Sequence, residues 1–257
     1  MSRACDYTAI FLAAGRGTRI RGQTTKPKIL LELQGRTLLQ RHLAALHAVG
    51  VRDVLFVVGH QKELVMAEAA QAPAGLRVRF VDNPEYASKG NTHSLCLGLR
   101  ETPAGALVFD ADLVYAAAIL ERFIAAASAD AILVGAGSPE DIEATKALVD
   151  DAGRVRKTVD KRALTAAELR VHRFAGEAIG ILKFSAAGRA ALLAECERFL
   201  AEPQNALLNW EHVLNQFLPH HSVACHFETC EDWIEIDTPE DFQRAAQKNF
   251  DPRPRAR

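Results

Sequence analysis

The sequence predicts a Rossmann-like, doubly wound α/β fold with a mostly parallel central sheet and a smaller β-containing region. Through residues 9–135, short apolar runs typical of strands buried on both faces alternate with amphipathic helical segments. Such alternation indicates parallel strands joined by helices that cover the sheet. Beyond residue 135 the segments are less regular, and Asp150-Asp151-Ala152-Gly153 is a strong hairpin signal.

The elements of the N-terminal half follow from this alternation. Leu38, Leu39, Leu43 and Leu46 lie on one helical stripe, and Gly50 is suited to end that helix. We expect strands at Ala9–Ala13, Asp53–Val58, Leu76–Val81, Ala106–Phe109 and Ala131–Gly135. We expect helices at Thr37–Val49, Gln61–Ala70 and Ala116–Ala127, and a further helix that begins at Asn91 or Thr92.

The C-terminal half combines a hairpin with isolated strands and helices. Thr238 and Pro239 suit the N-cap and first position of a last helix. We expect strands at Thr145–Val149, Arg154–Val159, Ala178–Phe184, Val223–Phe227 and Trp233–Ile236, and helices at Ala186–Leu200 and Asn209–Phe217. Since no repeat or linker divides the chain, we expect one domain over 1–250, with halves of about 1–135 and 136–248, and a flexible tail at 249–257.

Composition and charge exclude several classes of protein. The 257 residues are 49% hydrophobic and 25% charged, with a formal net charge of -1, so no overall field attracts nucleic acid or an anionic membrane. No apolar run approaches the roughly 18 residues of a membrane helix, and the N-terminus shows no signal-peptide pattern. The five cysteines are scattered without a C-x-x-C pair, which favours reduced thiols and a cytoplasmic location.

A glycine-bearing loop with cationic residues follows the first predicted strand. It reads Gly15-Arg16-Gly17-Thr18-Arg19, and Lys26-Pro27-Lys28 comes shortly after it. Glycine lets the main chain approach a ligand closely, and successive N–H groups bind anions. Because Arg19 and Lys28 add full positive charges beside these donors, the stretch predicts a polyphosphate site. The structural alternative is a basic turn after a core strand.

Two other phosphate-binding loops do not fit this stretch. The dinucleotide fingerprint G-x-G-x-x-G requires glycine where Ile20 stands, which weakens a nicotinamide-dependent oxidoreductase as an interpretation. The P-loop pattern requires lysine where Gln23 stands.

The residues do match the L-A-A-G-x-G-T-R…P-K signature of nucleotidyltransferases that join a nucleoside triphosphate to a small phosphorylated acceptor. From Thr8 to Ala245 the chain resembles that family. The resemblance implies that residues 1–135 bind the nucleotide and residues 136–248 the acceptor. It also implies catalytic roles for Arg19, Lys28 and Asp112.

Strand-end carboxylates are the candidate metal ligands. Asp112 follows the strand Ala106–Phe109, where the phosphates of a ligand would lie, and Mg²⁺ prefers oxygen ligands shared between carboxylate and phosphate. Asp110 is the alternative ligand, or it positions Asp112; a pair of helix-capping acids is the structural alternative. The resemblance adds Asp237, because the family closes its magnesium site with a late aspartate. We therefore expect Mg²⁺ between Asp112 and Asp237.

The resemblance also assigns nucleotide contacts. Lys89–Leu95 departs from the N-N-x-x-S-L run of phosphocholine-type members and is closer to the K-G-N-x-x-S-L run of inositol-1-phosphate cytidylyltransferases, so base and acceptor stay open. The expected nucleotide-binding residues are Leu12, Ala13, Ala14, Gly15, Gly17, Thr18, Gly90, Asn91, Ser94 and Asp110.

The acceptor contacts are expected from the second half. By resemblance Lys161 contacts the acceptor phosphate, and Glu143–Lys146 and Gly176–Phe184 match cytidylyltransferases acting on phosphocholine or 2-aminoethylphosphonate. Glu177, Trp210 and Glu211 fit an alkylammonium pocket, because carboxylates and ring faces both attract such a cation. Surface acids and a core tryptophan are the structural alternative.

Together these features predict an enzyme that transfers CMP from CTP to a small phosphate or phosphonate acceptor and releases pyrophosphate, with Mg²⁺ as cofactor. The alternative enzyme is a sugar-1-phosphate or inositol-1-phosphate nucleotidyltransferase. A nucleotide-binding regulator without catalysis is the alternative from another class, but Arg19, Lys28, Asp112 and Asp237 are all present. We expect a monomer or homodimer that binds neither nucleic acid nor membrane.

Overall fold

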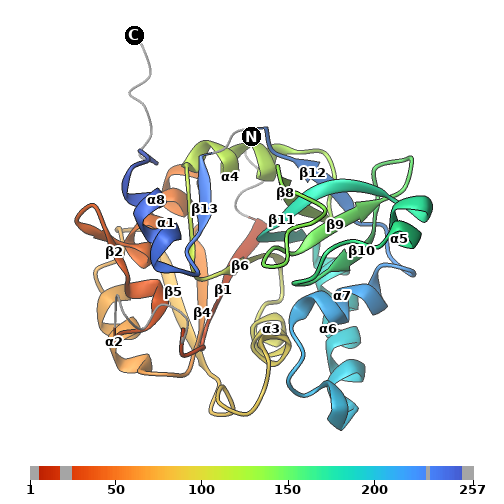
Figure 1. The fold of residues 1–257 in the computed structure, drawn as a ribbon. Helices are drawn as coiled ribbons and strands as arrows, with labels where there is room; N and C mark the ends of the chain where they lie inside the picture. The colour runs from red at the N-terminus through yellow and green to blue at the C-terminus, as the bar shows by residue number, and fades with distance from the viewer. Residues whose placement is uncertain (1–5, 18–24, 230–231, 251–257) are drawn as a thin grey trace.

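The computed structural model describes residues 6–17, 25–229 and 232–250, and is drawn in Figure 1. Within these residues a nine-stranded sheet forms the centre of the molecule. Its strands are β1 (Tyr7–Ala13), β4 (Asp53–Val58), β5 (Arg77–Asp82), β6 (Gly105–Asp110), β8 (Ala131–Gly135), β9 (Lys146–Val149), β10 (Val155–Val159), β11 (Arg173–Phe184) and β12 (Ala224–Phe227). The order is β10-β9-β11-β6-β1-β4-β5, with β8 beside β11 and β12 beside β8.

The centre of the sheet is parallel, as the alternation of strands and helices predicts. β1 pairs in parallel with β4 and β6, and β4 with β5. β11 then runs antiparallel to β6, and the same strand pairs with β8 and β9. The predicted hairpin is formed by β9 and β10, with Gly153 at φ +74° in its turn. The predicted fold class is confirmed, and both halves of the chain share this one sheet.

Helices cover both faces of the sheet. They are α1 (Leu38–Val49), α2 (Lys62–Ala69), α3 (Asn91–Arg100), α4 (Ala117–Ala125), α5 (Ala166–Val171), α6 (Ala186–Ala201), α7 (Trp210–Phe217) and α8 (Pro239–Ala246). Since side chains alternate along a strand, Phe11 of β1 packs in a cluster with α1, α2 and α4, whereas Ile10 packs with α3, α6 and α7 on the opposite face. The result is three layers (Figure 1).

Local signals define the helix ends that the sequence predicts. Thr37 caps α1 in a reciprocal capping box with Gln40, and Gly50 ends the helix at φ 86°. Thr238 caps α8 in the same way with Asp241, and Pro239 occupies the first turn. Both predicted starts are therefore confirmed.

A third apolar cluster attaches the C-terminal segment to the N-terminal half. The sequence analysis did not predict four short elements in this region: the 3-10 turn Lys28–Leu30, β2 (Glu32–Leu33), β3 (Arg36–Thr37) and β7 (Leu113–Tyr115). Of these, β2 and β7 contribute side chains to the cluster. The buried members are Leu31, Leu33, Leu38, Val114, Ile234, Ile236, Ala245 and Phe250. Phe250 falls within the predicted tail 249–257 but is 3% exposed; residues 251–257 lie outside the described part.

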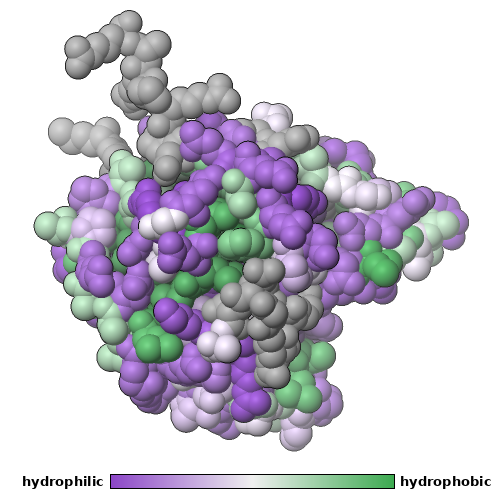
Figure 2. All heavy atoms as spheres, turned by 60° about the vertical axis from the view of Figure 1, so that its left-hand side comes forward, coloured by the Kyte–Doolittle hydropathy of each residue, from purple (hydrophilic) through white to green (hydrophobic). Residues whose placement is uncertain are grey.

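On the face shown in Figure 2, hydrophilic side chains cover most of the surface and hydrophobic ones are grouped in patches between them. Among the described residues, none of the helices has both the length and the apolar character needed to cross a bilayer.

Candidate active site

A two-stranded ladder brings the two predicted metal acids together. β13 (Trp233–Glu235) pairs antiparallel with β7, with Ile234 opposite Val114, and the N–H of Ile236 donates to the carbonyl of Asp112 at 3.0 Å. Ile234 and Ile236 anchor the strand in the third apolar cluster. This register places Asp237 beside Asp112, although 125 residues of chain separate the two.

Lys28 lies between these carboxylates. The preceding Pro27 is followed by the turn Lys28–Leu30, whose Ile29 and Leu30 are buried and so fix the direction of the lysine. Its Nζ donates to Asp112 Oδ2 at 2.8 Å and also to Asp237 Oδ1. The predicted trio of Lys28, Asp112 and Asp237 is thus assembled in one place.

The site is rich in acids. Burial lowers the pKa of Lys28, but the carboxylates of Asp112 and Asp237 outweigh that effect and raise it to about 12. Burial, together with Asp112, raises the pKa of Glu235 and of Asp110 well above the ordinary carboxyl range. Several carboxyl groups around one buried ammonium therefore create a strong preference for additional cations.

A cavity of about 300 Å³ opens above this cluster. Gly17 is at φ +56°, and a Cβ there would lie 3.3 Å from Lys28 Cβ, so this glycine permits the close approach of loop and lysine. The cavity is lined by the predicted nucleotide-binding residues Leu12, Ala13, Ala14, Gly15, Gly17, Gly90, Asn91, Ser94 and Asp110. The predicted residues Thr18 and Arg19 lie outside the described residues.

The start of α3 forms one wall of this cavity, and the segment 206–208 packs behind it. A Cβ on Gly90 would lie 2.3 Å from the carbonyl oxygen of Leu208, so only glycine allows this contact. Asn91 Oδ1 accepts the backbone N–H of Trp210 at 2.8 Å, and Ser94 Oγ accepts from Asn83 Nδ2 at 3.0 Å. The side chains of Asn91 and Ser94 therefore already have protein partners.

The sequence analysis missed other residues of this wall. Asn83, Tyr86 and Lys89 also line the cavity, and the guanidinium of Arg16 lies 5.6 Å from the centroid of the Tyr86 ring. Tyr86 is followed in sequence by a loop leading to Lys89, a turn-rich stretch that carries no periodic signal. The sequence indicates a binding role for this wall only through an aromatic residue and a lysine in the loop before the predicted helix.

Trp210 requires a correction. Its predicted role as an acceptor-pocket ring needs an exposed face, but Trp210, the first residue of α7, is 2% exposed and belongs to the core cluster of α3, α6 and α7. Its Nε1–H donates to both oxygens of Asp110, at 3.3 and 3.2 Å. Trp210 therefore orients Asp110 from within the core, which is the core-tryptophan alternative.

The other predicted acceptor residues are divided between two places. Lys161 Nζ lies 3.8 Å from Asp237 Oδ2, and so beside the predicted metal-binding carboxylates. Glu211 is buried near Asp160 and Thr145, whereas Glu177 lines a second cavity, which Glu211 does not line. The structure does not bring Glu177, Trp210 and Glu211 into one pocket.

Glu177 belongs to a second cavity of about 740 Å³, which meets the first at Asp237. Asp141, Asp241 and Arg244 also line it. Burial, followed by the charge of Asp141, raises the pKa of Glu177 to about 7. This cavity is bordered by residues 136–248, with acids more numerous than bases.

Three carboxylates are placed to hold one metal ion. Oxygen atoms of Asp112, Glu235 and Asp237 all lie within 4.8 Å of one another. Asp112 Oδ1 is buried without a hydrogen-bond partner, and an oxygen-only donor set suits Mg²⁺. Glu235 was missed from sequence, although it stands two residues before Asp237, a spacing that places both side chains on one face of a strand.

The chain is similar to known NTP transferases and cytidylyltransferases. The family model described as "MobA-like NTP transferase domain" matches residues 9–206. CMP-5'-(3-aminopropyl)phosphonate synthase of Streptomyces rubellomurinus is 35% identical over 50% of this chain and 21% of its own length. 2-Aminoethylphosphonate cytidylyltransferase of Lancefieldella rimae is 36% identical over 44% of this chain and 46% of its own length.

The chain thus spans less than half the length of either relative in these matches. Among solved structures, CTP:phosphocholine cytidylyltransferase from Streptococcus pneumoniae has a TM-score of 0.74 with 22% identity, covering 94% of this chain and 98% of that one. At this identity the likeness concerns the fold.

Proposed function

The chain belongs to the family of the MobA-like NTP transferase domain, and from this premise we propose that it transfers CMP from CTP to a small phosphate or phosphonate that carries an ammonium group. The observation that carries the proposal is the contact of Lys28 with Asp112 and Asp237, which are 84 and 209 residues away in sequence. This contact lies beside a cavity bordered by the glycine loop and by the start of α3.

Mg²⁺ fits the acids of this site. Asp112, Glu235 and Asp237 would hold it, and Asp112 Oδ1 is a buried oxygen without a hydrogen-bond partner. When bound, Mg²⁺ supplies positive charge that screens the phosphates and stabilises charge developing during transfer.

In the proposed reaction, an acceptor oxygen forms a bond to the α-phosphorus of CTP while the bond from that phosphorus to the bridging oxygen of the β-phosphate breaks. Pyrophosphate leaves with the electron pair of the broken bond. A phosphate monoester loses its second proton near pKa ~6, so the nucleophile is already an anion and needs no general base. The protein therefore has to bring anions together and neutralise their charge.

Cationic side chains around Asp237 perform this task. Lys28 lines the first cavity, where its ammonium contacts Asp112 and Asp237, and we assign it to the triphosphate. Lys161 reaches Asp237 from the second half, and we assign it to the acceptor phosphate. The backbone N–H groups of Gly15 and Gly17, which line the first cavity, are assigned to the phosphates as well.

The second cavity supports an ammonium-bearing acceptor. It begins at Asp237 and contains Glu177 and Asp141, so an acceptor with its phosphate near Lys161 would extend its cationic end toward carboxylates. The names of the two phosphonate-related proteins indicate acceptors of that kind. In this assignment residues 1–135 bind the nucleotide and residues 136–248 the acceptor, within one domain.

The test is a matrix of four NTPs against 2-aminoethylphosphonate, choline phosphate, inositol phosphate and hexose phosphates, followed by pyrophosphate release in the presence of Mg²⁺. We expect turnover with CTP and an amino-bearing acceptor. Turnover confined to inositol or hexose phosphates would support the alternative enzyme. No turnover in any combination, with nucleotide binding retained, would indicate a binding protein and refute the proposal.

A further inference from the structure

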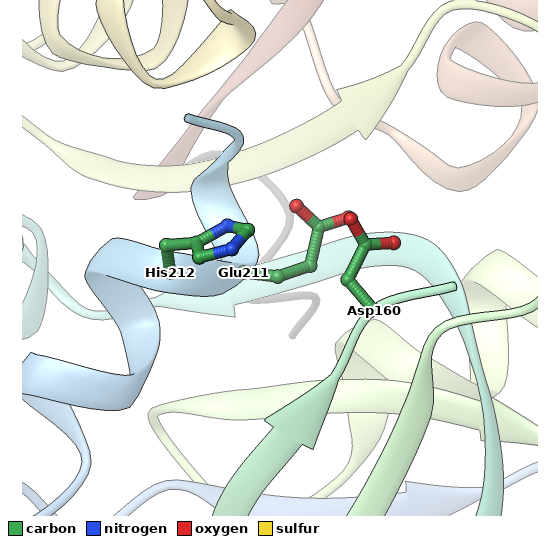
Figure 3. Close-up of side chains that lie close together, drawn as sticks. All are labelled: Asp160, Glu211 and His212. Carbon is green, nitrogen blue, oxygen red and sulfur yellow. The ribbon is translucent and has the colours of Figure 1, made fainter. Parts of the chain in front are cut away.

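A second group of potential metal ligands lies outside both cavities. Figure 3 shows the carboxylates of Asp160 and Glu211 facing one another, with the imidazole of His212 beside them. One ligand atom from each residue lies within 4.8 Å of the others. Asp160 follows β10, and Glu211 and His212 belong to the first turn of α7. We propose that Asp160, Glu211 and His212 bind a divalent transition-metal ion.

The frame of this site is held by hydrogen bonds that do not use the proposed ligand atoms. Thr158 N–H donates to Asn215 Oδ1 at 2.8 Å, and Asn215 Nδ2 donates back to the carbonyl of Thr158 at 2.8 Å. Thr158 Oγ1 also donates to the carbonyl of Glu211 at 3.0 Å. α7 is thereby fixed on β10, and this fixes Glu211 against Asp160 before any ligand binds.

The polar atoms inside this frame are left without sufficient donors. Glu211 is 8% exposed, and its Oε2 is buried with no hydrogen-bond partner; the same holds for Nδ1 of His212. Thr145 Oγ1 lies 3.0 Å from Asp160 Oδ1 and 3.4 Å from Glu211 Oε1, but it has a single hydrogen to donate. A buried carboxylate oxygen without a partner is costly, and a bound cation removes that cost.

Among the described residues, no ion pair joins Asp160 or Glu211 to a cationic side chain. Lys161 follows Asp160 directly, but its Nζ lies 3.8 Å from Asp237 Oδ2. Burial raises the pKa of Glu211 to about 8, although the charge of Lys161 opposes the rise. The two cavities described above are not lined by Asp160, Glu211 or His212. The proposed ligand set is therefore separate from the linings of both cavities.

The donor set indicates the class of ion. Imidazole nitrogen suits Zn²⁺ and Fe²⁺ better than Ca²⁺ or Mg²⁺, and the two carboxylates of the set also suit Mn²⁺. Ligand atoms around an ion at ~2.1 Å stand roughly 3.4 Å apart in tetrahedral geometry. The present separations of up to 4.8 Å therefore close by small side-chain rotations.

Mn²⁺ is the best probe, because it is a hard ion that competes little for the cysteine thiols, and its spin reports the ligand type. Full-length protein freed of metal by chelation is titrated with Mn²⁺, and electron spin-echo modulation is recorded. Directly coordinated imidazole gives a ¹⁴N signature, which the all-oxygen group of Asp112, Glu235 and Asp237 lacks.

We expect nitrogen-coupled Mn²⁺ in the wild-type protein and in Asp112→Asn, and its loss in His212→Gln. Glu211→Gln should weaken binding by at least about tenfold. The matched control is His220→Gln, which changes an exposed histidine just after α7 and should leave the signal unchanged. Absence of nitrogen coupling in the wild-type protein, or its persistence in His212→Gln, would overturn the proposal. Because the readout is metal binding, the outcome is independent of the proposed transferase activity.

Discussion

Replacing Lys28 by methionine removes one charge from the centre of the acid cluster and keeps most of the side-chain volume. The Lys28 side chain is 12% exposed, and its Nζ contacts Asp112 Oδ2 at 2.8 Å and Asp237 Oδ1. Its pKa rises from 10.5 to about 12, because the two carboxylates outweigh the opposing effect of burial. A rise of that size corresponds to ~2 kcal/mol of stabilisation of the charged form.

Without nucleotide and metal, we therefore expect Lys28→Met to lower the free energy of unfolding by ~2 kcal/mol, which is about 4–8 °C in Tm for a domain of this size. A raised lysine pKa stabilises the fold fully below the unfolded value of 10.5 and loses this effect only as the pH rises through about 12. The loss should thus be equal at pH 6 and pH 9. Mg²⁺ should raise Tm more in the variant than in the wild type, since it replaces the missing cation.

Turnover should fall by about 10²–10³-fold in the same variant, since one charge contact to the reacting phosphates is removed. The assay is pyrophosphate release with CTP and the preferred acceptor, alongside thermal unfolding. The matched control is Lys62→Met, because Lys62 pairs with Asp82 on the surface, with side chains 37% and 48% exposed, where such a pair contributes little. Near-normal turnover of Lys28→Met, or a Tm no lower than that of Lys62→Met, would refute the reasoning.

Three further variants address the metal acids, the second cavity and the wall of the first. Asp237→Asn should lower kcat by about 10²–10³-fold and raise the Mg²⁺ concentration needed for half-maximal pyrophosphate release; an unchanged Mg²⁺ dependence would contradict its role as a ligand. Burial raises the pKa of Glu177 to about 7, so ionisation destabilises the fold as pH rises from 4.5 to 7. Glu177→Gln should accordingly raise Tm at pH 8 but not at pH 5, and increase KM for an amino-bearing acceptor; equal Tm shifts at both pH values would argue against a buried carboxylate. Gly90→Ala places a Cβ 2.3 Å from the Leu208 carbonyl oxygen and should cost ~1–3 kcal/mol in chemical denaturation. The open position Gly15, with nothing within 4 Å of a Cβ, should tolerate alanine without loss of stability.

Sequence patterns predict elements well where the determinants are local. The strands Asp53–Val58 and Ala131–Gly135 are found with the predicted bounds, because each is an apolar run of strand length between turn residues. The helix after Thr37 ends at Gly50 for reasons contained in the same segment. β11 begins at Arg173, five residues before the predicted Ala178, because its extension depends on pairing with β9.

The acid cluster could be expected only through family resemblance. Asp112 and Asp237 meet because β7 pairs with β13, and each of these strands has three residues. Strands this short carry almost no periodic signal, and their pairing depends on burial of Ile234 and Ile236 in a cluster formed by distant segments. No property of Trp233–Asp237 alone indicates its partner.

Side-chain exposure could not be predicted either. Trp210 follows Asn209 at a helix start, and both a core position and a ligand-facing one were compatible with that sequence. The outcome depends on Asp110, 100 residues earlier, whose carboxylate accepts the indole N–H. Glu177 and Glu211 are likewise separated by the path of β11 and α7, which is a property of the whole sheet.

β11 limits how the enzyme can move. Its twelve residues pair with β6 at one end and with β9 at the other. Its pairing with β8 shifts register between Ala178 and Leu182, which indicates a bulge at this point. Gly180 lies within the bulge at φ +80°, and a Cβ on this residue would lie 2.7 Å from Asp110 Oδ2. Because β11 of the second half is hydrogen-bonded to β6 of the first half, the two halves cannot separate as hinged rigid bodies without breaking this pairing. In the proposed reaction, entry of substrates and release of pyrophosphate must therefore depend on the segments that connect the strands, while the sheet stays rigid.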